Sequence, residues 1–483
     1  GYPENEKDSG RFEKFFHLFS EIVLFSEDAM KNYMVLRQLE DYLMKYTEDV
    51  SIQEFCCLMR CEDRQLERLI LERQDKQKGK APIDLYIFDP ARMAVRELFS
   101  REPIFEPILD GLSFQEGEKE PDLLYKIPEP HIFIAGFGKL GQAVLHEALL
   151  TGDLTPFSRI KGYEKLRVTI VDHDKEGTRS KIKTMYPAIE KICNINIIAA
   201  DALDRDVETE LSKYPMPTYA AICFSDPSIN IGMFRELTDY LNMRHINREH
   251  FQTGNLEKHT DCGKYLPVAV YIDKNERELL ELMGYQHGGY CRLIAFGGME
   301  HILNRSNIVD SRIEQEAMSF NYAYLSLQGI GHLATPMELW KKLDHEKRAS
   351  NRAQAANRRY IRRILDYIPA LPQKDEIILC AADTDKILSK LREYPTLDQL
   401  ACWEHRRWNN FHYASGYIGY DPDPSNKGQL KPYPVEYGDM IYGKVHNCLI
   451  DDWEELKRNE TSVTTVIYDI YAIYACAENG DDI

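Results

Sequence analysis

Three glycines spaced as GxGxxG are the residues of this chain whose types and spacing most directly suggest chemistry. Gly136, Gly138 and Gly141 lie in "HIFIAGFGKLG", between an apolar stretch that favours a strand and a stretch that favours a helix. The first glycine permits a tight turn, the second lets the backbone approach a pyrophosphate, and the third lets the helix pack closely on the strand. The free N–H groups and positive dipole of a helix N-terminus attract phosphate oxygens. The turn therefore predicts a phosphate site formed by Gly136, Phe137, Gly138, Lys139, Leu140 and Gly141.

An acidic residue at the end of the next strand would complete such a site by accepting hydrogen bonds from ribose hydroxyls. Asp172 in "TIVDHD" occupies this place, and His173 follows it. Asp172 comes later than the ~20 residues usual after the glycine turn. A lengthened helix-to-strand connection over 151–165 explains the delay. The alternative interpretation is a fold of this class that holds no nucleotide.

The elements that must position these residues alternate along the middle of the chain. Short apolar, β-rich runs separated by helical stretches indicate an α/β fold, with a Rossmann-like doubly wound parallel sheet covered on both faces. Residues 11–75 have apolar residues at helical spacing, which predicts an N-terminal helical region. The six expected strands lie at 131–136, 166–172, 195–201, 219–226, 268–273 and 291–298.

Residues 131–245 resemble the N-terminal Rossmann domain of TrkA and RCK proteins, the regulators of potassium conductance. The resemblance depends on "GFGKLG", "VDHD", "AADALD" and "CFSDPSINI", each at the end of an expected strand. It implies that Asp201 and Ala202 lie near an adenine, and that Ser225, Asp226 and Asn230 lie near the other half of the nucleotide. It also implies NAD(H) or an adenine nucleotide as the ligand, and a change of shape on binding without chemistry.

The C-terminal region concentrates aromatic and basic side chains in "LACWEHRRWNNFHYASGYIGY". Indoles and phenols stack on planar ligands, and arginine binds phosphate with two parallel hydrogen bonds. This combination suits a base with a phosphate. The alternative is that these residues form the core of a small domain. The ligand candidates are Trp403, His405, Arg406, Arg407, Trp408, Tyr413 and Tyr417.

The same region resembles the ryanodine-receptor-type (RyR) domain, through "LACWEHRRW", "GYIGY" and "HNCLIDDWEEL". Over roughly residues 132–456, the chain resembles bacterial proteins that join a TrkA-type Rossmann unit to an RyR module. The resemblance implies a mainly helical C-terminal domain that senses a ligand or docks a partner. The basic stretch 341–363 precedes it, and is either a solvated helix face or a surface that faces an anion.

These patterns divide the chain into five parts. We expect an N-terminal helical region at 1–80, a small α/β segment with a linker at 81–130, and the nucleotide-binding domain at 131–330. A basic connecting helix at 331–372 and the RyR-type domain at 373–483 complete the chain. A polar insertion is expected at 247–265.

The composition of the chain limits the classes of binding partner that we expect. A formal charge of −18 over 483 residues argues against general nucleic-acid binding, because phosphate backbones reward clustered cations. No apolar run approaches the ~20 residues that span a bilayer, so we expect a cytoplasmic protein, tethered to a membrane if a spanning segment precedes residue 1. Neither cysteines nor histidines are spaced as a metal site. A homodimer, and a membrane channel or transporter fused upstream or acting in trans, are the protein partners that the resemblance implies.

Three classes of function remain open. The first is a regulator that senses a nucleotide and controls ion transport or a defence or stress response. The second is an NAD(P)-dependent oxidoreductase, but the chain has no Tyr-x-x-x-Lys pair and no catalytic constellation. The third is an adaptor that docks a protein partner and in which the Rossmann unit is purely structural. We expect a sensor, not an enzyme.

Overall fold

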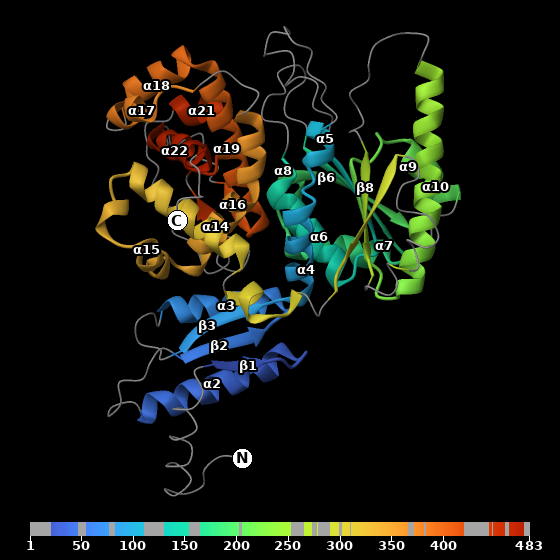
Figure 1. Cartoon of the computed structure of the whole chain (residues 1–483), viewed down its shortest axis with the longest axis horizontal. Helices are drawn as coiled ribbons and strands as arrows, with labels where there is room; N and C mark the ends of the chain where they lie inside the picture. The colour runs from blue at the N-terminus through green and yellow to red at the C-terminus, as the bar shows by residue number, and fades with distance from the viewer. Residues whose placement is uncertain are drawn as a thin grey trace, which may run out of the picture.

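The computed structural model describes most of the chain and shows a mixed α/β protein with two parallel sheets (Figure 1). The described residues are 21–46, 55–76, 83–110, 130–153, 165–201, 205–252, 265–272, 278, 290–298, 302–309, 311–365, 371–380, 383–419, 444–446, 448–458 and 463–477. Ala202 and the greater part of the expected insertion at 247–265 lie outside them.

The larger sheet has six parallel strands in the order β6-β5-β4-β7-β8-β9. The strand order reverses between β4 and β7, and ligands of open α/β sheets bind outside the carboxyl ends of the strands at such a reversal. Each of the six strands falls within or beside an expected run, so this part of the prediction is confirmed. The strands are β4 (His131–Ala135), β5 (Leu166–Asp172), β6 (Cys193–Ala199), β7 (Tyr219–Ile222), β8 (Leu266–Tyr271) and β9 (Cys291–Phe296).

Both faces of this sheet are buried, which explains why its strands are nearly continuous apolar runs. Along β4, Ile132 and Ile134 face one core, and Phe133 and Ala135 face the other. The first core is covered by α4 (Pro90–Arg101), α6 (Lys139–Thr151), α7 (Lys175–Met185) and α8 (Ile189–Ile192). The second is covered by α9 (Arg205–Ser212) and α10 (Pro227–Gln252).

We expected the N-terminal part of the chain to be helical. The structure shows instead that it forms a second α/β unit. Its three parallel strands lie in the order β1-β2-β3, with bounds β1 (Glu21–Leu24), β2 (Phe55–Arg60) and β3 (Ile83–Phe88). The helices between them are α2 (Ala29–Tyr46) and α3 (Arg64–Lys76). Because β2 pairs with β3, this unit crosses the boundary that we had placed at residue 80. Helices α4 and α5 (Glu106–Asp110) follow it.

The C-terminal third is a mainly helical unit, and its helices form a core cluster that also includes Ile108 and Leu109 of α5. That core also includes α14, which we had assigned to the nucleotide-binding domain, and α16, which we had treated as a connector. Four helices, α14, α16, α19 and α22, contribute most of the core. The bounds are α13 (Arg305–Val309), α14 (Arg312–Leu327), η4 (Gly331–Leu333), α15 (Pro336–Lys342), α16 (His345–Leu365), α17 (Lys374–Cys380), α18 (Thr384–Glu393), α19 (Pro395–Ala414), β10 (Tyr417–Gly419), β11 (Lys444–His446), α21 (Trp453–Arg458), η5 (Val463–Thr465) and α22 (Val466–Ala477).

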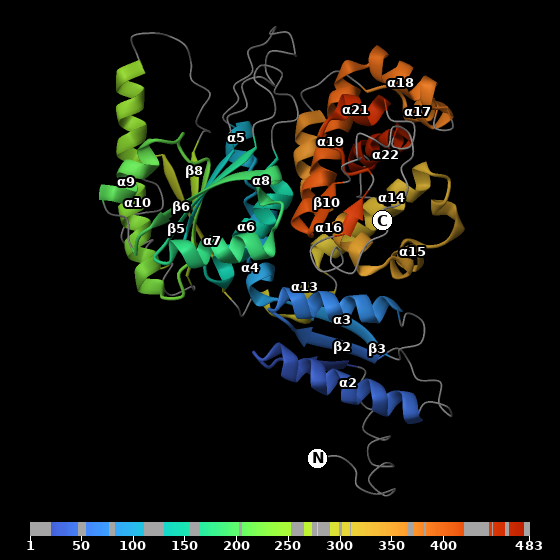
Figure 2. The same cartoon turned by 180° about the vertical axis from the view of Figure 1, so that it is seen from behind.

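Figures 1 and 2 show how the three units are arranged. The six-stranded sheet and the helical unit lie on opposite sides of α4 and α6, and the N-terminal unit lies below both. Helix α6 is therefore central to the molecule. Within the described residues, no helix combines the length and the apolar character that crossing a bilayer requires.

Candidate functional site

The glycine turn joins the end of β4 to the start of α6, as the sequence predicts. Gly136 has a positive φ of +86°, which residues with a side chain rarely adopt, and its N–H donates to the carbonyl of Val171 over 2.8 Å. A Cβ at this position would also lie 2.9 Å from the ring of Phe224. The backbone conformation and the neighbouring ring both require glycine here.

The other two glycines differ in what surrounds them. A Cβ at Gly141 would lie 2.1 Å from the carbonyl oxygen of Gly136, so only glycine lets α6 start this close to the turn. Gly138 is the N-cap of α6 and is exposed, and a Cβ there would meet no atom of the described residues within 4 Å. Open space above an exposed helix N-terminus is the geometry that phosphate binding needs.

The flanking residues of the turn divide between core and surface. Phe137 and Leu140 are buried in the core between the sheet and its helices. Lys139 is the first residue of α6, and its side chain is 71% exposed. Of the flanking side chains, only that of Lys139 is accessible to a ligand. Phe137 and Leu140 could contact a ligand only through their backbone.

Asp172 ends β5 beside the turn. Its Oδ2 accepts the N–H of Phe137 over 2.8 Å, and its Oδ1 accepts the N–H of Asp174 over 3.0 Å. The carboxylate thus holds the glycine turn in place, and each oxygen keeps acceptor capacity for a ribose hydroxyl. His173 is 74% exposed and its Nδ1 lies 3.5 Å from Oδ1 of Asp172.

The candidates after the third and fourth strands lie at the same carboxyl edge. Asp201 follows β6 and is exposed. Ser225 and Asp226 follow β7 and are exposed. Asp226 also accepts the N–H of Ser228 over 2.8 Å and so stabilises the start of α10. These positions agree with a ligand that lies across the edge from β6 to β7.

Asn230 is the exception among these candidates, because its side chain is fully buried and serves the fold. Its Nδ2 donates to the carbonyls of Phe224 and Tyr271, over 2.9 and 2.8 Å, and its Oδ1 accepts the N–H of Phe224 over 2.9 Å. The amide ties the end of β7 to the end of β8. The structure therefore gives Asn230 a supporting role in place of the direct ligand contact that we expected.

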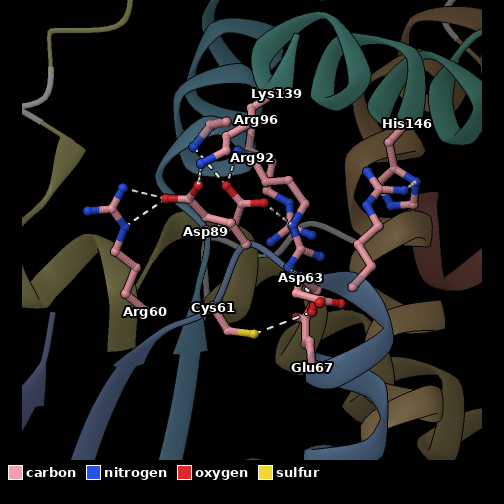
Figure 3. Close-up of polar contacts among 12 residues, drawn as sticks. Arg60, Cys61, Asp63, Glu67, Asp89, Arg92, Arg96, Lys139 and His146 are labelled. Atoms are coloured by element: carbon pink, nitrogen blue, oxygen red, sulfur yellow. Dashed lines mark hydrogen bonds and ion pairs between the residues drawn. The ribbon is translucent and has the colours of Figure 1, made fainter. Parts of the chain in front are cut away.

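The N-terminal unit reaches the glycine turn, which the sequence did not indicate. The ammonium of Lys139 contacts the carboxylate of Glu62, which follows β2. Glu62 also accepts a 2.7 Å hydrogen bond from Nε of Arg60. In Figure 3, Arg60 and Lys139 approach the same polar cluster from the N-terminal sheet and from the first turn of α6.

A second group of polar contacts joins α3 and α4 to α6 farther along that helix. Arg96 on α4 pairs with Glu147 over 2.9 Å, and Nη1 of Arg64 on α3 lies 3.3 Å from Nδ1 of His146. Arg92 on α4 pairs with Asp89, over 3.2 Å, and with Glu67 of α3, which connects α4 to the N-terminal unit. The labels of Arg92, Arg96 and His146 in Figure 3 mark this region.

The C-terminal ligand candidates form the core of the helical unit and its contact with α6. Trp403, His405 and Arg407 are buried, and Arg407 forms two hydrogen bonds of 2.8 and 2.9 Å with Glu404. His405 lies between Asp469, at 3.1 Å from Nδ1, and the carbonyl of Ile450, at 3.1 Å from Nε2. These contacts are those expected of a domain core, the alternative that we had set beside ligand binding.

The remaining members of this set are also engaged within the protein. The hydroxyl of Tyr413 donates to Asp451 over 2.7 Å, and that of Tyr417 contacts Glu346. Trp408 is half-buried, with its ring 3.8 Å from that of His412. The described contacts thus point to packing and not to a ligand at these side chains.

Arg406 and Trp403 connect the helical unit to the end of α6. Nη2 of Arg406 contacts both carboxylate oxygens of Asp153, at 2.9 and 3.2 Å, and Nε1 of Trp403 donates to the Asp153 carbonyl over 2.8 Å. Asn357 of α16 donates to the carbonyl of Leu150 over 2.8 Å. Arg406, predicted to hold an anionic ligand, holds an internal carboxylate.

The basic helix likewise directs several of its cations inward. Arg358 and Arg362 donate to the carbonyl of Cys476 near the end of α22, over 3.4 and 3.2 Å, where positive charge stabilises a helix C-terminus. Arg352 contacts Glu314 of α14. For these arginines the structure does not support a surface that faces an anion.

The described part of the chain contains no group of three or more His, Cys, Asp or Glu side chains that could hold a metal ion. No family model, curated protein or solved structure matches the chain. The likeness to Rossmann regulators and to RyR modules is therefore carried by the sequence motifs alone.

Sequence analysis missed Glu62, which contacts the first residue of α6, and Asp153, which lies just beyond the end of that helix. Glu62 lies 77 residues before its partner Lys139, and Asp153 lies 253 residues before Arg406. Neither belongs to a motif. Only the packing of the three units around α6 brings these two residues into contact with Lys139 and Arg406.

Proposed function

We propose that this chain is a regulatory protein that binds NAD(H) or an adenine nucleotide through a Rossmann-type domain. The phosphates would lie over Gly138 and the first turn of α6, near Lys139. The ribose would lie at Asp172, and the rest of the nucleotide would extend toward Asp201 on one side and Ser225 on the other. The family resemblance favours an ion channel or transporter as the target that the protein regulates.

The observation that carries this proposal is the open space above Gly138 at the strand-order reversal between β4 and β7. The turn has the conformation and close packing that a phosphate loop needs, because Gly136 and Gly141 both lie where a side chain cannot. Among the residues that the structure describes, no atom lies within 4 Å of the place that a Cβ of Gly138 would occupy.

The surroundings of the turn favour sensing over chemistry. Hydride transfer needs a proton donor or acceptor held beside the substrate. His173, which follows Asp172 at the edge of the sheet, has a side chain that is 74% exposed. By contrast, all three units meet α6: Lys139 at its start contacts the N-terminal unit, and Asp153 just beyond its end contacts the helical unit. A ligand that shifts the first turn of α6 can therefore bias the position of both.

Titration calorimetry with NAD⁺, NADH, ATP and ADP tests the proposal on the full chain. At least one nucleotide should bind and raise the melting temperature, because a ligand of the native state stabilises it. Gly138→Val should weaken binding at least tenfold while the melting temperature of the free protein stays unchanged, since the added side chain meets open space. Absence of binding for all four nucleotides would exclude the proposal and favour an adaptor.

A second variant tests the ribose contact. Asp172→Asn keeps one oxygen that can accept the N–H of Phe137, so the turn should persist, but it removes the charge and one of the acceptors. We expect about tenfold weaker binding of nucleotides and no change for inorganic pyrophosphate. Nicotinamide absorbance that changes with an alcohol or carbonyl substrate would identify an oxidoreductase instead.

A further inference from the structure

The first turn of α6 is already in contact with an anion, and that anion belongs to the N-terminal unit. The carboxylate of Glu62 contacts the ammonium of Lys139, the residue that follows Gly138. Glu62 lies in the loop after β2, and Lys139 is the first residue of α6. The two carboxyl edges of separate parallel sheets therefore meet at one ion pair.

The two partners differ in how firmly they are held. The side chain of Glu62 is 10% exposed and is fixed by Arg60 as well, whereas that of Lys139 is 71% exposed. Burial raises the pKa of Glu62, but hydrogen bonds from Lys139 and Arg60 outweigh it, and the pKa lies below its usual value. At neutral pH Glu62 is therefore a carboxylate held by Arg60, and Lys139 is the more exposed partner.

We propose that Glu62 is a built-in competitor of the nucleotide phosphate for Lys139, and that nucleotide binding releases this contact between the N-terminal unit and α6. The inference rests on the proposed function and adds its regulation. A phosphate above Gly138 needs the ammonium and is repelled by the neighbouring carboxylate. The side chain of Lys139 must move from Glu62 to the phosphate. The loop after β2 then loses its ion pair with the glycine turn.

Two other contacts with α6 lie away from the phosphate position. Arg64–His146 and Arg96–Glu147 are seven and eight residues beyond Lys139, or about 11 and 12 Å along the helix at 1.5 Å per residue. The Arg64 contact, and the pair of Arg92 on α4 with Glu67 on α3, would keep the N-terminal unit attached while the loop of Glu62 opens. The expected change is thus a local opening beside the nucleotide, not dissociation of the unit.

Binding measurements on matched variants of the full chain test the competition. Glu62→Gln removes the charge and preserves the shape, while Glu67→Gln removes a carboxylate that pairs with Arg92 and not with the glycine turn. ADP, NAD⁺ and inorganic pyrophosphate are the probes. We expect Glu62→Gln to bind them about tenfold more tightly than the wild type, or about 1.4 kcal/mol. Glu67→Gln should match the wild type, and Lys139→Gln should bind more weakly.

Hydrogen exchange detects the opening itself. Saturating ADP should speed amide exchange at residues 61–66 in the wild type, and have little effect there in Glu62→Gln, where the tie is already lost. Equal affinities of Glu62→Gln and Glu67→Gln, or slower exchange at 61–66 with ADP, would overturn the competition and leave the nucleotide site intact. If none of the proteins binds any probe, the proposed function itself fails, and the competition with it.

Discussion

Asp153 and Arg406 form the ion pair that joins the end of α6 to the helical unit. Nη2 of Arg406 lies 2.9 and 3.2 Å from the two carboxylate oxygens, and the side chains are 16% and 5% exposed for Arg406 and Asp153, respectively. Sequence analysis placed Arg406 in a ligand site because arginine in an aromatic setting suits a phosphate. The structure shows that its anion is part of the protein.

Loss of Arg406 should therefore destabilise the fold. Arg406→Ala leaves the buried carboxylate of Asp153 without its charged partner, and breaking a buried pair in this way costs about 3 kcal/mol. Urea unfolding measures the loss. Arg179→Ala breaks the exposed pair with Glu176 and serves as the control, with an expected change below about 1 kcal/mol. Equal stability of the two variants would show that the Asp153 contact contributes little.

The close packing of the glycine turn predicts a sharp difference between two alanine substitutions. Gly141→Ala places a Cβ 2.1 Å from the carbonyl oxygen of Gly136, a backbone atom that cannot move aside, so we expect a loss of about 1–3 kcal/mol. Gly138→Ala meets no atom within 4 Å and should change stability by less than about 0.5 kcal/mol. Thermal and urea unfolding of the ligand-free proteins compare them. A Gly141→Ala protein as stable as Gly138→Ala would mean that α6 starts farther from the turn.

Asn230 should behave as a residue of the fold and not of the ligand. Asn230→Ala leaves the buried N–H of Phe224 and the carbonyls of Phe224 and Tyr271 without their partner, which should cost about 3 kcal/mol in the absence of any nucleotide. Ser225→Ala, an exposed neighbour, is the control and should leave stability unchanged. If Asn230→Ala is stable but binds nucleotides poorly, the original ligand assignment is right.

The six-stranded sheet was predictable because each of its strands leaves a local trace. A strand buried on both faces is an apolar run, and the glycine pattern marks where the first run ends, as at Ile132–Ala135 and Gly136. Strand β3 falls in the small α/β segment that we expected, but β1 and β2 were missed, because β1 is four residues long and only partly buried and β2 follows a stretch with helical spacing. Short strands carry little periodic signal.

The roles of individual side chains were harder to predict than the strands. A motif states which residue types are present, but the partner of each side chain depends on packing between distant segments. Asp172 was expected at the edge and is there, yet its hydrogen bond to Phe137 depends on how β5 lies beside β4. Arg406 was expected to meet an anion and does, but the anion is Asp153, two residues beyond the end of α6.

The buried pair of His405 and Asp469 predicts a dependence of stability on pH. Burial lowers the pKa of His405, but the charge and hydrogen bond of Asp469 outweigh it, and the pKa of the histidine is raised. Glu404 faces the same group, and burial raises its pKa, although Arg407 counteracts this. When a histidine has a higher pKa in the folded state than in the unfolded chain, its protonation stabilises the folded state. This stabilisation is fully present at pH values below the unfolded-state pKa, near 6.5, and is lost as the pH rises through the folded-state pKa.

The free energy of unfolding should therefore decline as the pH rises above about 6.5, with a slope of at most about 1.4 kcal/mol per pH unit for one proton. Asp469→Asn removes the charge that keeps the His405 proton, so the decline over this range should flatten even if the variant is less stable overall. His332→Asn, at an exposed histidine, is the control and should keep the wild-type slope. Urea unfolding at four pH values provides the measurement. An identical slope in Asp469→Asn and the wild type would mean that His405 is neutral in the core throughout this range, and that the pair is an ordinary hydrogen bond.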